Sequence, residues 1–86
     1  MGYGEIFKAL SDPVRRDILS MLKKGKLSAG AIACKFDMSG ATVSYHLGVL
    51  KRAGLITEDR QRTFVYYHLN RPVLDEALAW MEELKK

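Results

Sequence analysis

Residues 28–69 read SAGAIACKFDMSGATVSYHLGVLKRAGLITEDRQRTFVYYHL, and this run divides into four short segments. Two helical patterns are separated by a tight turn at Asp37 and Met38, and two β-strand patterns follow Gly54. The second helix is rich in small polar residues, and the hairpin has a basic tip. This order predicts a helix-turn-helix over 28–54 and a β-hairpin wing over 55–69. Such a unit presents one helix and one hairpin to a duplex, so the pattern points to DNA.

The residues on either side of this unit predict further helices and one short strand. Apolar spacing predicts helices over 3–10, from Pro13 to Gly25, and over 71–86, and it places Leu27 in a strand of one or two residues. The expected fold class is mainly α with a small β-hairpin, a winged helix-turn-helix. Its expected order is helix, helix, strand, helix, helix, strand, strand, helix. The 86 residues are expected to form a single domain, 1–86.

Local signals support these boundaries. The second strand is expected to turn Val65, Tyr67 and Leu69 toward the core, whereas Phe64, Tyr66 and His68 face the other side. The hairpin strands are expected over 55–58 and 63–69, and Gly54 supplies the left-handed stop before them. The candidate helix caps are Ser11 or Asp12, Ser28, Ser39 and Asn70.

Composition and charge agree with a DNA partner without requiring one. The formal charge is +4 and the pI is about 9.4, which favours an anionic partner weakly. Asp75, Glu76, Glu82 and Glu83 lie near the C-terminus, so the excess of Lys and Arg lies upstream. The single cysteine, Cys34, rules out a disulfide within the chain and fits a reducing cytoplasm. No apolar run resembles a signal peptide or a membrane span, and we expect a cytoplasmic protein.

The helix that follows Ser39 is the candidate reading helix. Its apolar stripe of Val43, Leu47 and Leu50 fixes which side faces inward. The alternative is a solvated amphipathic helix, but such faces usually carry Glu, Lys and Gln, which are good helix formers. Small polar residues instead let a helix sit deep in a major groove about 12 Å wide. The residues expected on the free side, as DNA contacts, are Ser39, Gly40, Ala41, Thr42, Ser44, Tyr45 and His46.

The expected hairpin turn, Asp59 to Arg62, carries two arginines. Arg60 and Arg62 are candidate contacts to phosphates or to a narrow minor groove. The alternative is a charged loop that keeps the hairpin soluble. Lys51 and Arg52 lie one turn further along the reading helix. For these two side chains, a contact to the DNA backbone and a purely solvent-exposed role are equally open.

These features together resemble the ArsR family of bacterial winged-helix regulators over nearly the whole chain. The matching stretches are 7–19 (FKALSDPVRRDIL), 44–47 (SYHL) with 50–56 (LKRAGLI), and 64–70 (FVYYHLN). Residues 28–30, the tyrosine pair and Trp80 look most like the branch containing the autorepressor of the sporulation-delaying-protein immunity operon. The resemblance implies a homodimer that binds a palindromic operator and blocks transcription, with DNA contacts from 39–46, Arg60 and Arg62. The family often has glycine in the wing turn, where this chain has Gln61 between two arginines.

The last helix predicts a dimer. Leu74, Ala77, Leu78, Met81 and Leu84 form one stripe with Val73 and Trp80 beside it, which is more apolar surface than a small domain readily covers. The alternative is that this helix completes the core of the monomer. A two-fold interface through residues 1–10 and 71–86 accounts better for the surface. The interface candidates are Tyr3, Ile6, Phe7, Leu10, Leu74, Leu78, Trp80 and Met81.

The sequence offers little sensing or catalytic chemistry. The resemblance implies that many relatives bind metals or arsenite, through thiolates on the third helix or through His and carboxylates on the last one. The thiolate positions hold Ser28 and Gly30 here, and the last helix has carboxylates but no histidine. A soft-metal site needs several thiolates, so we expect no metal site, no cofactor and no evident small-molecule ligand. Cys34 is expected as a half-buried hydrophobe, with a redox- or ligand-responsive sensor as the alternative. The resemblance implies an antirepressor that is a membrane protein, and no residue pattern supports an enzyme.

Overall fold

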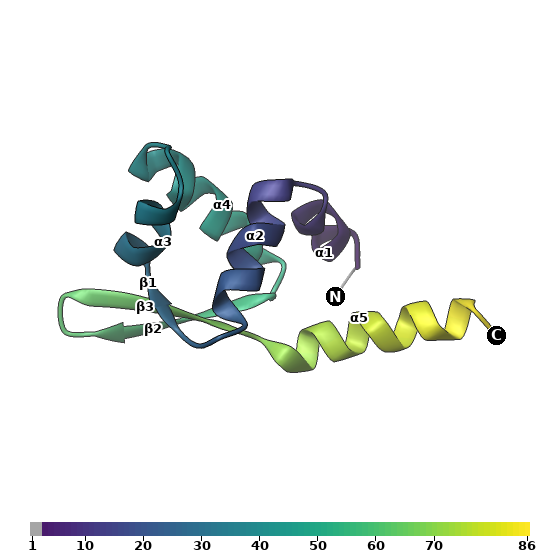
Figure 1. The fold of residues 1–86 in the computed structure, drawn as a ribbon. Coiled ribbons are helices and arrows are strands. Elements are labelled where there is room, and N and C mark those ends of the chain that lie inside the picture. The colour runs from purple at the N-terminus through teal and green to yellow at the C-terminus, as the bar shows by residue number, and fades with distance from the viewer. Residues whose placement is uncertain (1–2) are drawn as a thin grey trace.

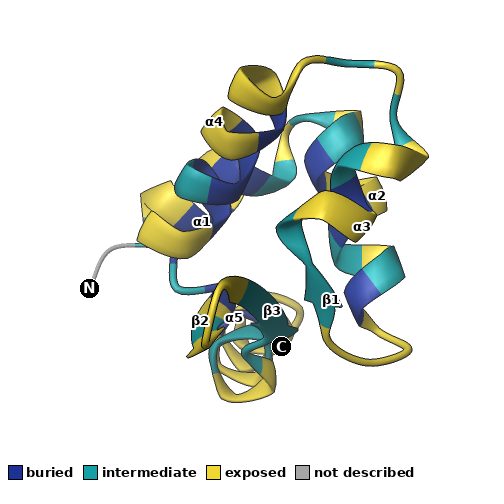
Figure 2. Cartoon of the chain, turned by 90° about the vertical axis from the view of Figure 1, so that its left-hand side faces the viewer, coloured by how far each residue is buried: buried dark blue, intermediate teal, exposed yellow. Residues whose placement is uncertain are grey.

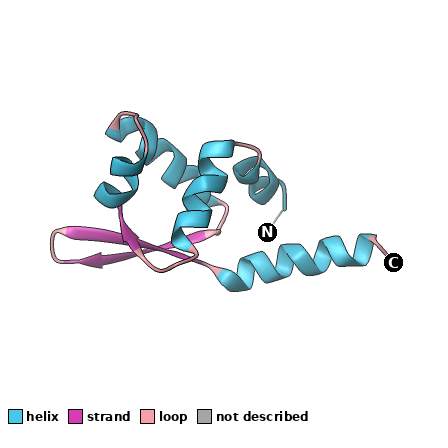
Figure 3. Ribbon diagram, in the orientation of Figure 1, coloured by secondary structure: helices cyan, strands magenta, loops and turns pink. Residues whose placement is uncertain are grey.

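The computed structural model describes residues 3–86, and it confirms the predicted winged helix-turn-helix (Figure 1; Figure 3). Five helices and three short strands follow one another in the expected order. No helix within 3–86 is long and apolar enough to cross a membrane. The elements are α1 (Tyr3–Leu10), α2 (Pro13–Leu22), β1 (Leu27–Ser28), α3 (Ala29–Lys35), α4 (Gly40–Arg52), β2 (Ile56–Gln61), β3 (Phe64–Leu69) and α5 (Arg71–Leu84).

Side-chain caps start three of the helices, α2, α3 and α4. Ser28 Oγ accepts from the Ala31 amide at 3.1 Å and so begins α3. Asp12 Oδ2 accepts from the amides of Val14 and Arg15 at 2.8 and 3.2 Å, which starts α2. Desolvation acts to raise the pKa of the Asp12 carboxyl, but the two amide hydrogen bonds together with the nearby positive charge of Arg15 outweigh it, and the pKa lies below its usual value. These caps place the helix starts where the sequence predicts them.

Asn70 departs from the expected capping role. It occupies the position before α5, but its side chain makes no capping hydrogen bond there. Its Nδ2 instead donates to the Gly54 carbonyl at 2.9 Å, and its backbone amide donates to the Leu55 carbonyl at 2.9 Å. Asn70 therefore fastens the start of α5 to the end of the recognition unit.

The sheet is antiparallel in the order β1-β3-β2, with Leu27 opposite Tyr67 and Ile56 opposite Leu69. Strand β2 continues to Gln61, three residues beyond the expected end at Glu58. Gln61 pairs with Phe64, so the turn consists of residues 62 and 63 alone. The hairpin is therefore longer, and its tip tighter, than the sequence predicts.

The core lies where the helices meet the root of the hairpin (Figure 2). Tyr67 and Leu69 of β3 pack against this core, as their alternation in the strand predicts. Helix α5 contributes only Ala77 to the fully buried set, and it extends away from the sheet along the molecule (Figure 1). The buried hydrophobic residues are Ile6, Ala9, Ile18, Leu22, Ile32, Val43, Leu47, Val49, Leu50, Ala53, Leu55, Ile56 and Ala77.

Candidate nucleic-acid interface

The N-terminal half of α4 presents a polar face to solvent. Ser39 caps this helix, since its Oγ accepts from the Thr42 amide at 3.1 Å. The first turn carries no acidic residue, although the helix dipole favours one there. Val43, Leu47 and Leu50 are buried, as predicted, and so hold the opposite face against the core. The exposed residues are Ser39, Gly40, Ala41, Thr42, Ser44 and Tyr45.

His46 does not belong to this face, and its predicted outward position is wrong. Its exposed fraction is 9%, and its Nδ1 lies 3.1 Å from Nη1 of Arg15. Position 46 falls between 49 and 50 on the helical wheel, and both of those residues are buried, so the backbone turns its side chain toward the core whatever its polarity. His46 is thus removed from the set of candidate base contacts.

Arg15 is a buried charged residue beside the reading helix, and no burial was predicted for it from the sequence. Its exposed fraction is 7%, although it is charged, and its guanidinium contacts both α1 and α4. It lies three and seven residues before Ile18 and Leu22, which are buried on the same helix. That spacing is the signal that could have placed Arg15 on the inner face of α2.

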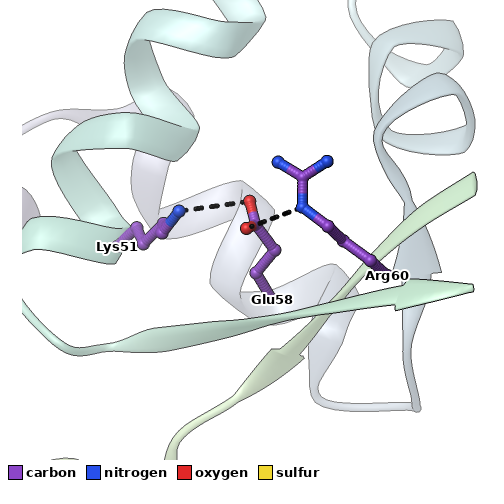
Figure 4. Close-up of polar contacts among 3 residues, drawn as sticks. All are labelled: Lys51, Glu58 and Arg60. Atoms are coloured by element: carbon purple, nitrogen blue, oxygen red, sulfur yellow. Dashed lines mark ion pairs between the residues drawn. The ribbon is translucent and has the colours of Figure 1, made fainter.

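A chain of three charges links α4 to the wing (Figure 4). Glu58 Oε2 lies 3.2 Å from Nζ of Lys51, and its Oε1 lies 3.5 Å from Nε of Arg60. The hydrogen bond from Lys51 is the main reason that the pKa of Glu58 lies below its ordinary value of 4.5. This pairing is fully present above that ordinary value and is lost as the pH falls through the lowered one, so it is intact at neutral pH.

The two wing arginines occupy different positions, although the sequence placed both on the turn. Arg60 lies on strand β2 opposite Val65, because the hairpin is longer than expected. Arg62 is at the turn, with a φ of 56° that few residues other than glycine adopt. Phe64 follows at the tip with an exposed fraction of 58%, and the sequence analysis did not assign it a role. The wing tip therefore combines one charged and one aromatic side chain.

The helix-turn-helix and the wing tip lie at the same end of the molecule, and the C-terminus of α5 lies at the other (Figure 1). The structure separates this end from the exposed apolar surface of α5.

The predicted dimer residues fall into three groups by burial: buried, half-buried and exposed. Ile6 is fully buried inside the chain, so its side chain cannot lie at an interface, and that assignment is wrong. The Trp80 ring stacks on Tyr3 at 5.4 Å between ring centroids and tilts against Phe7 at 5.7 Å. Tyr3, Leu10 and Leu74 are half-buried. The exposed members are Phe7, Leu78, Trp80 and Met81.

The residues considered for sensing are also placed. Cys34 is exposed on α3, not half-buried as the sequence predicts. Within residues 3–86, no group of three or more His, Cys, Asp or Glu side chains is arranged to hold a metal ion.

An outward-facing capped helix beside a two-stranded hairpin that carries Arg60 and Arg62 defines a winged helix-turn-helix DNA-binding protein. Residues 10–59 match the family model described as a helix-turn-helix domain. The chain is 47% identical over 76 residues to the transcriptional repressor SdpR of Bacillus subtilis (strain 168), covering 88% of this chain and 84% of that protein. It is 36% identical over 83 residues to the arsenical resistance operon repressor of the same organism, covering 95% of this chain and 77% of that protein.

A solved structure agrees with these sequence relatives. The ArsR-like transcriptional regulator from Rhodococcus sp. RHA1 superposes with a TM-score of 0.90 at 25% identity, covering 96% of this chain and 76% of that one. The chain belongs to the ArsR family of transcriptional repressors, in its SdpR-like branch. Its relatives are transcriptional regulators, which are not enzymes, and this agrees with the expectation from the sequence.

Proposed function

We propose that this protein represses transcription as a homodimer on a palindromic operator, with α4 of each protomer in a major groove. The observation that carries the proposal is the N-terminal face of α4, which is exposed, rich in small residues and free of acidic side chains. Gly, Ser and Thr on this face are poorer helix formers than the Glu, Lys and Gln of ordinary solvated faces. Without an acidic residue, the positive N-terminal end of the helix dipole also has no negative charge beside it. DNA phosphates supply the compensating negative charge.

The proposed contacts divide by role. The free amides at residues 39–41 bind a phosphate, which fixes the register of the helix on the duplex. Thr42, Ser44 and Tyr45 are the side chains that reach base edges, and Arg62 and Arg60 contact the backbone from the wing. Tyr45 has an exposed fraction of 58%, which supports its place at the centre of the reading face.

The exposed apolar residues of α1 and α5 form the proposed dimer interface. Residues 1–10 and 71–86 then serve dimerisation, whereas 28–54 form the helix-turn-helix and 55–69 the wing. Leu78 and Leu84 have exposed fractions of 55% and 65%, so the chain alone leaves them in water. A two-fold axis through this surface would place the reading helices about 34 Å apart, one turn of B-form DNA.

A salt titration combined with footprinting tests this function. The DNA upstream of the protein's own coding region is the first target, since we propose autoregulation in the cytoplasm. If the dimer makes ~6–10 phosphate contacts, its affinity is expected to fall by about 10³–10⁵ between 50 and 200 mM salt. A flat salt dependence, or a protected site without two-fold symmetry, would contradict the proposal.

Release from DNA is proposed not to depend on a bound metal. Ser28 and Gly30 stand where related sensors carry thiolates, and neither residue offers a thiolate to a soft metal. Operator binding is therefore expected to stay constant in the presence of arsenite, cadmium or a chelator. Release by one of these reagents would favour the alternative, a ligand-responsive sensor. Constant binding supports relief by a protein partner, such as a membrane-protein antirepressor that sequesters the dimer.

Glu58→Gln is expected to tighten binding to DNA of any sequence by about threefold to tenfold. The change removes one negative charge and releases Lys51 and Arg60 to pair with phosphates. Fluorescence anisotropy at several salt concentrations measures the effect, and a steeper salt dependence is expected alongside it. The matched control is Glu83→Gln, which removes the same charge from a residue of α5 that pairs with Lys86 just beyond the end of the helix. Weaker binding by Glu58→Gln would show that Glu58 orients the two cations instead of competing for them.

Arg62→Gly is expected to weaken DNA binding without destabilising the hairpin. A residue other than glycine pays about 1–2 kcal/mol to adopt the left-handed conformation, and glycine removes this cost. The greater conformational entropy of glycine in the unfolded chain offsets about 0.4–1 kcal/mol of that gain in stability. Losing one phosphate contact per protomer lowers the salt slope of the dimer by about 2. Thermal unfolding and the salt titration measure the two effects separately. Arg62→Lys is the control, because it keeps the charge and the backbone conformation. Equal affinity of the Gly variant and the unaltered chain would remove the wing tip from the interface.

A further inference from the structure

The Arg15 guanidinium joins three helices at one buried point. Its Nε donates to the Ala9 carbonyl at 2.8 Å and its Nη2 donates to the Lys8 carbonyl at 3.1 Å, both in the last turn of α1. Its Nη1 lies 3.1 Å from Nδ1 of His46, in the middle of α4. Arg15 itself belongs to α2, so a single planar group fixes the distance between α1 and the recognition helix.

The chemistry of the contact determines the tautomer of His46. A guanidinium has donors only and does not lose its proton in proteins. Nδ1 of His46 must therefore accept with its lone pair, and the imidazole proton lies on Nε2. No buried side-chain nitrogen or oxygen within residues 3–86 lacks a hydrogen-bond partner, so this polar network is fully satisfied.

A buried charge in so small a core calls for a reason other than stability. Replacing a buried ionic or polar group by apolar residues of similar volume is often neutral or stabilising, and such groups can serve to specify one arrangement of the chain. Here the arrangement that is specified lies between two functional surfaces. Tyr45 of the reading face precedes His46, and Phe7, which packs against Trp80 of α5, precedes Lys8.

We propose that Arg15 is a positioning residue that sets the orientation of the recognition helix relative to the dimerisation helices. It acts through His46 on one side and through the Lys8 and Ala9 carbonyls on the other. The half-site spacing that the dimer prefers is then fixed by this contact. The inference rests on the proposed function, because it assumes that α4 reads DNA and that α1 and α5 form the dimer.

Two substitutions at His46 separate positioning from folding. His46→Asn keeps an acceptor near the position of Nδ1, whereas His46→Leu removes it and keeps the volume. Each variant dimer is measured well below its melting temperature, on operators with altered half-site spacing and on unrelated DNA. For His46→Leu, the ratio of operator to unrelated affinity is expected to fall about tenfold, the factor for losing a hydrogen bond to a charged group. His46→Leu is also expected to bind operators with different half-site spacings more equally. His46→Asn is expected to restore most of the affinity ratio and most of the spacing preference.

The tautomer supplies an independent measurement on the unaltered protein. Imidazole nitrogen chemical shifts are expected to show an unprotonated Nδ1 and a protonated Nε2 at neutral pH, and Arg15→Met is expected to change that signature. A proton on Nδ1 in the unaltered chain would overturn the proposal. The proposal would also be overturned if His46→Leu lost affinity equally for the operator and for unrelated DNA, because a purely structural role lowers both affinities together.

Failure of the proposed function has a different signature from failure of this inference. If the proposed function is wrong, the unaltered dimer will bind the operator and unrelated DNA with equal affinity, and the positioning role will then be wrong as well. A specific unaltered dimer whose spacing preference is unchanged in His46→Leu overturns the positioning role alone.

Discussion

An Ala41→Glu variant is expected to fold at least as stably as the unaltered chain and yet to lose about 100-fold or more in DNA affinity. Ala41 lies in the first turn of α4, is exposed, and has no acidic neighbour in that turn. A carboxylate there gains about 0.3–1 kcal/mol from the helix dipole, and Glu is nearly as good a helix former as Ala. On DNA, the same carboxylate faces phosphates, and such a juxtaposition costs several kcal/mol, which is about 10²-fold or more in affinity.

The opposite signs of these two effects make the test sharp. Urea denaturation measures stability, and anisotropy on the footprinted operator measures binding. Ala41→Gln is the matched control, because it has the same shape without the charge, and its affinity is expected to fall much less. If Ala41→Glu bound the operator as tightly as Ala41→Gln does, this end of α4 would not lie against DNA.

The helix starts could be predicted because their causes are local. Asp12, Ser28 and Ser39 each accept a hydrogen bond from an amide two or three residues further along, so the capping chemistry is visible in a few letters. Gly54 likewise adopts a positive φ of 77° at the position where the sequence requires a left-handed stop. Cap and stop together place α4 correctly, and with it most of the proposed reading face.

The errors arise where a partner on another element decides the outcome. His46 is polar, so the sequence analysis placed it outside, but Arg15 supplies a buried donor that only the tertiary fold brings near. The apolar surface of the last helix predicts a dimer in which Ile6 of the first helix takes part, but the core of the chain itself covers Ile6 completely. The spacing of apolar residues shows that a side chain is to be buried, but it does not show whether the core of the chain or a second protomer buries it.

The wing shows a third kind of error. Register in a hairpin depends on the turn, and the turn here uses Arg62 with positive φ where glycine is the usual choice. Without a glycine signal, the sequence predicts that the first strand ends at Glu58, three residues before its observed end. The extra pairs moved Arg60 onto the strand, within 3.5 Å of Glu58, so one predicted contact became part of an ion-pair chain.

Leu78→Glu is expected to yield a folded monomer that binds a two-half-site operator about 10²-fold or more weakly, since joint engagement of two sites raises affinity by about 10²–10⁴. Leu78 has an exposed fraction of 55% within the chain, so its replacement removes little from the core. In the proposed dimer it is buried against the partner, where an unpaired carboxylate is strongly unfavourable. Analytical ultracentrifugation measures the association, circular dichroism measures folding, and anisotropy measures binding.

The control is Ala79→Glu on the same helix. About 100° of rotation per residue places Ala79 between Asp75 and Glu83 on the polar face of α5, away from Leu78. It adds the same charge, so both variants reduce electrostatic attraction to DNA alike, and only Leu78→Glu is expected to dissociate the dimer. Because a single half-site is bound by one protomer, affinity for an isolated half-site is expected to be similar in the two variants. A Leu78→Glu protein that remained dimeric would exclude this flank of α5 from the interface, and the two-fold arrangement of the reading helices would then require another surface.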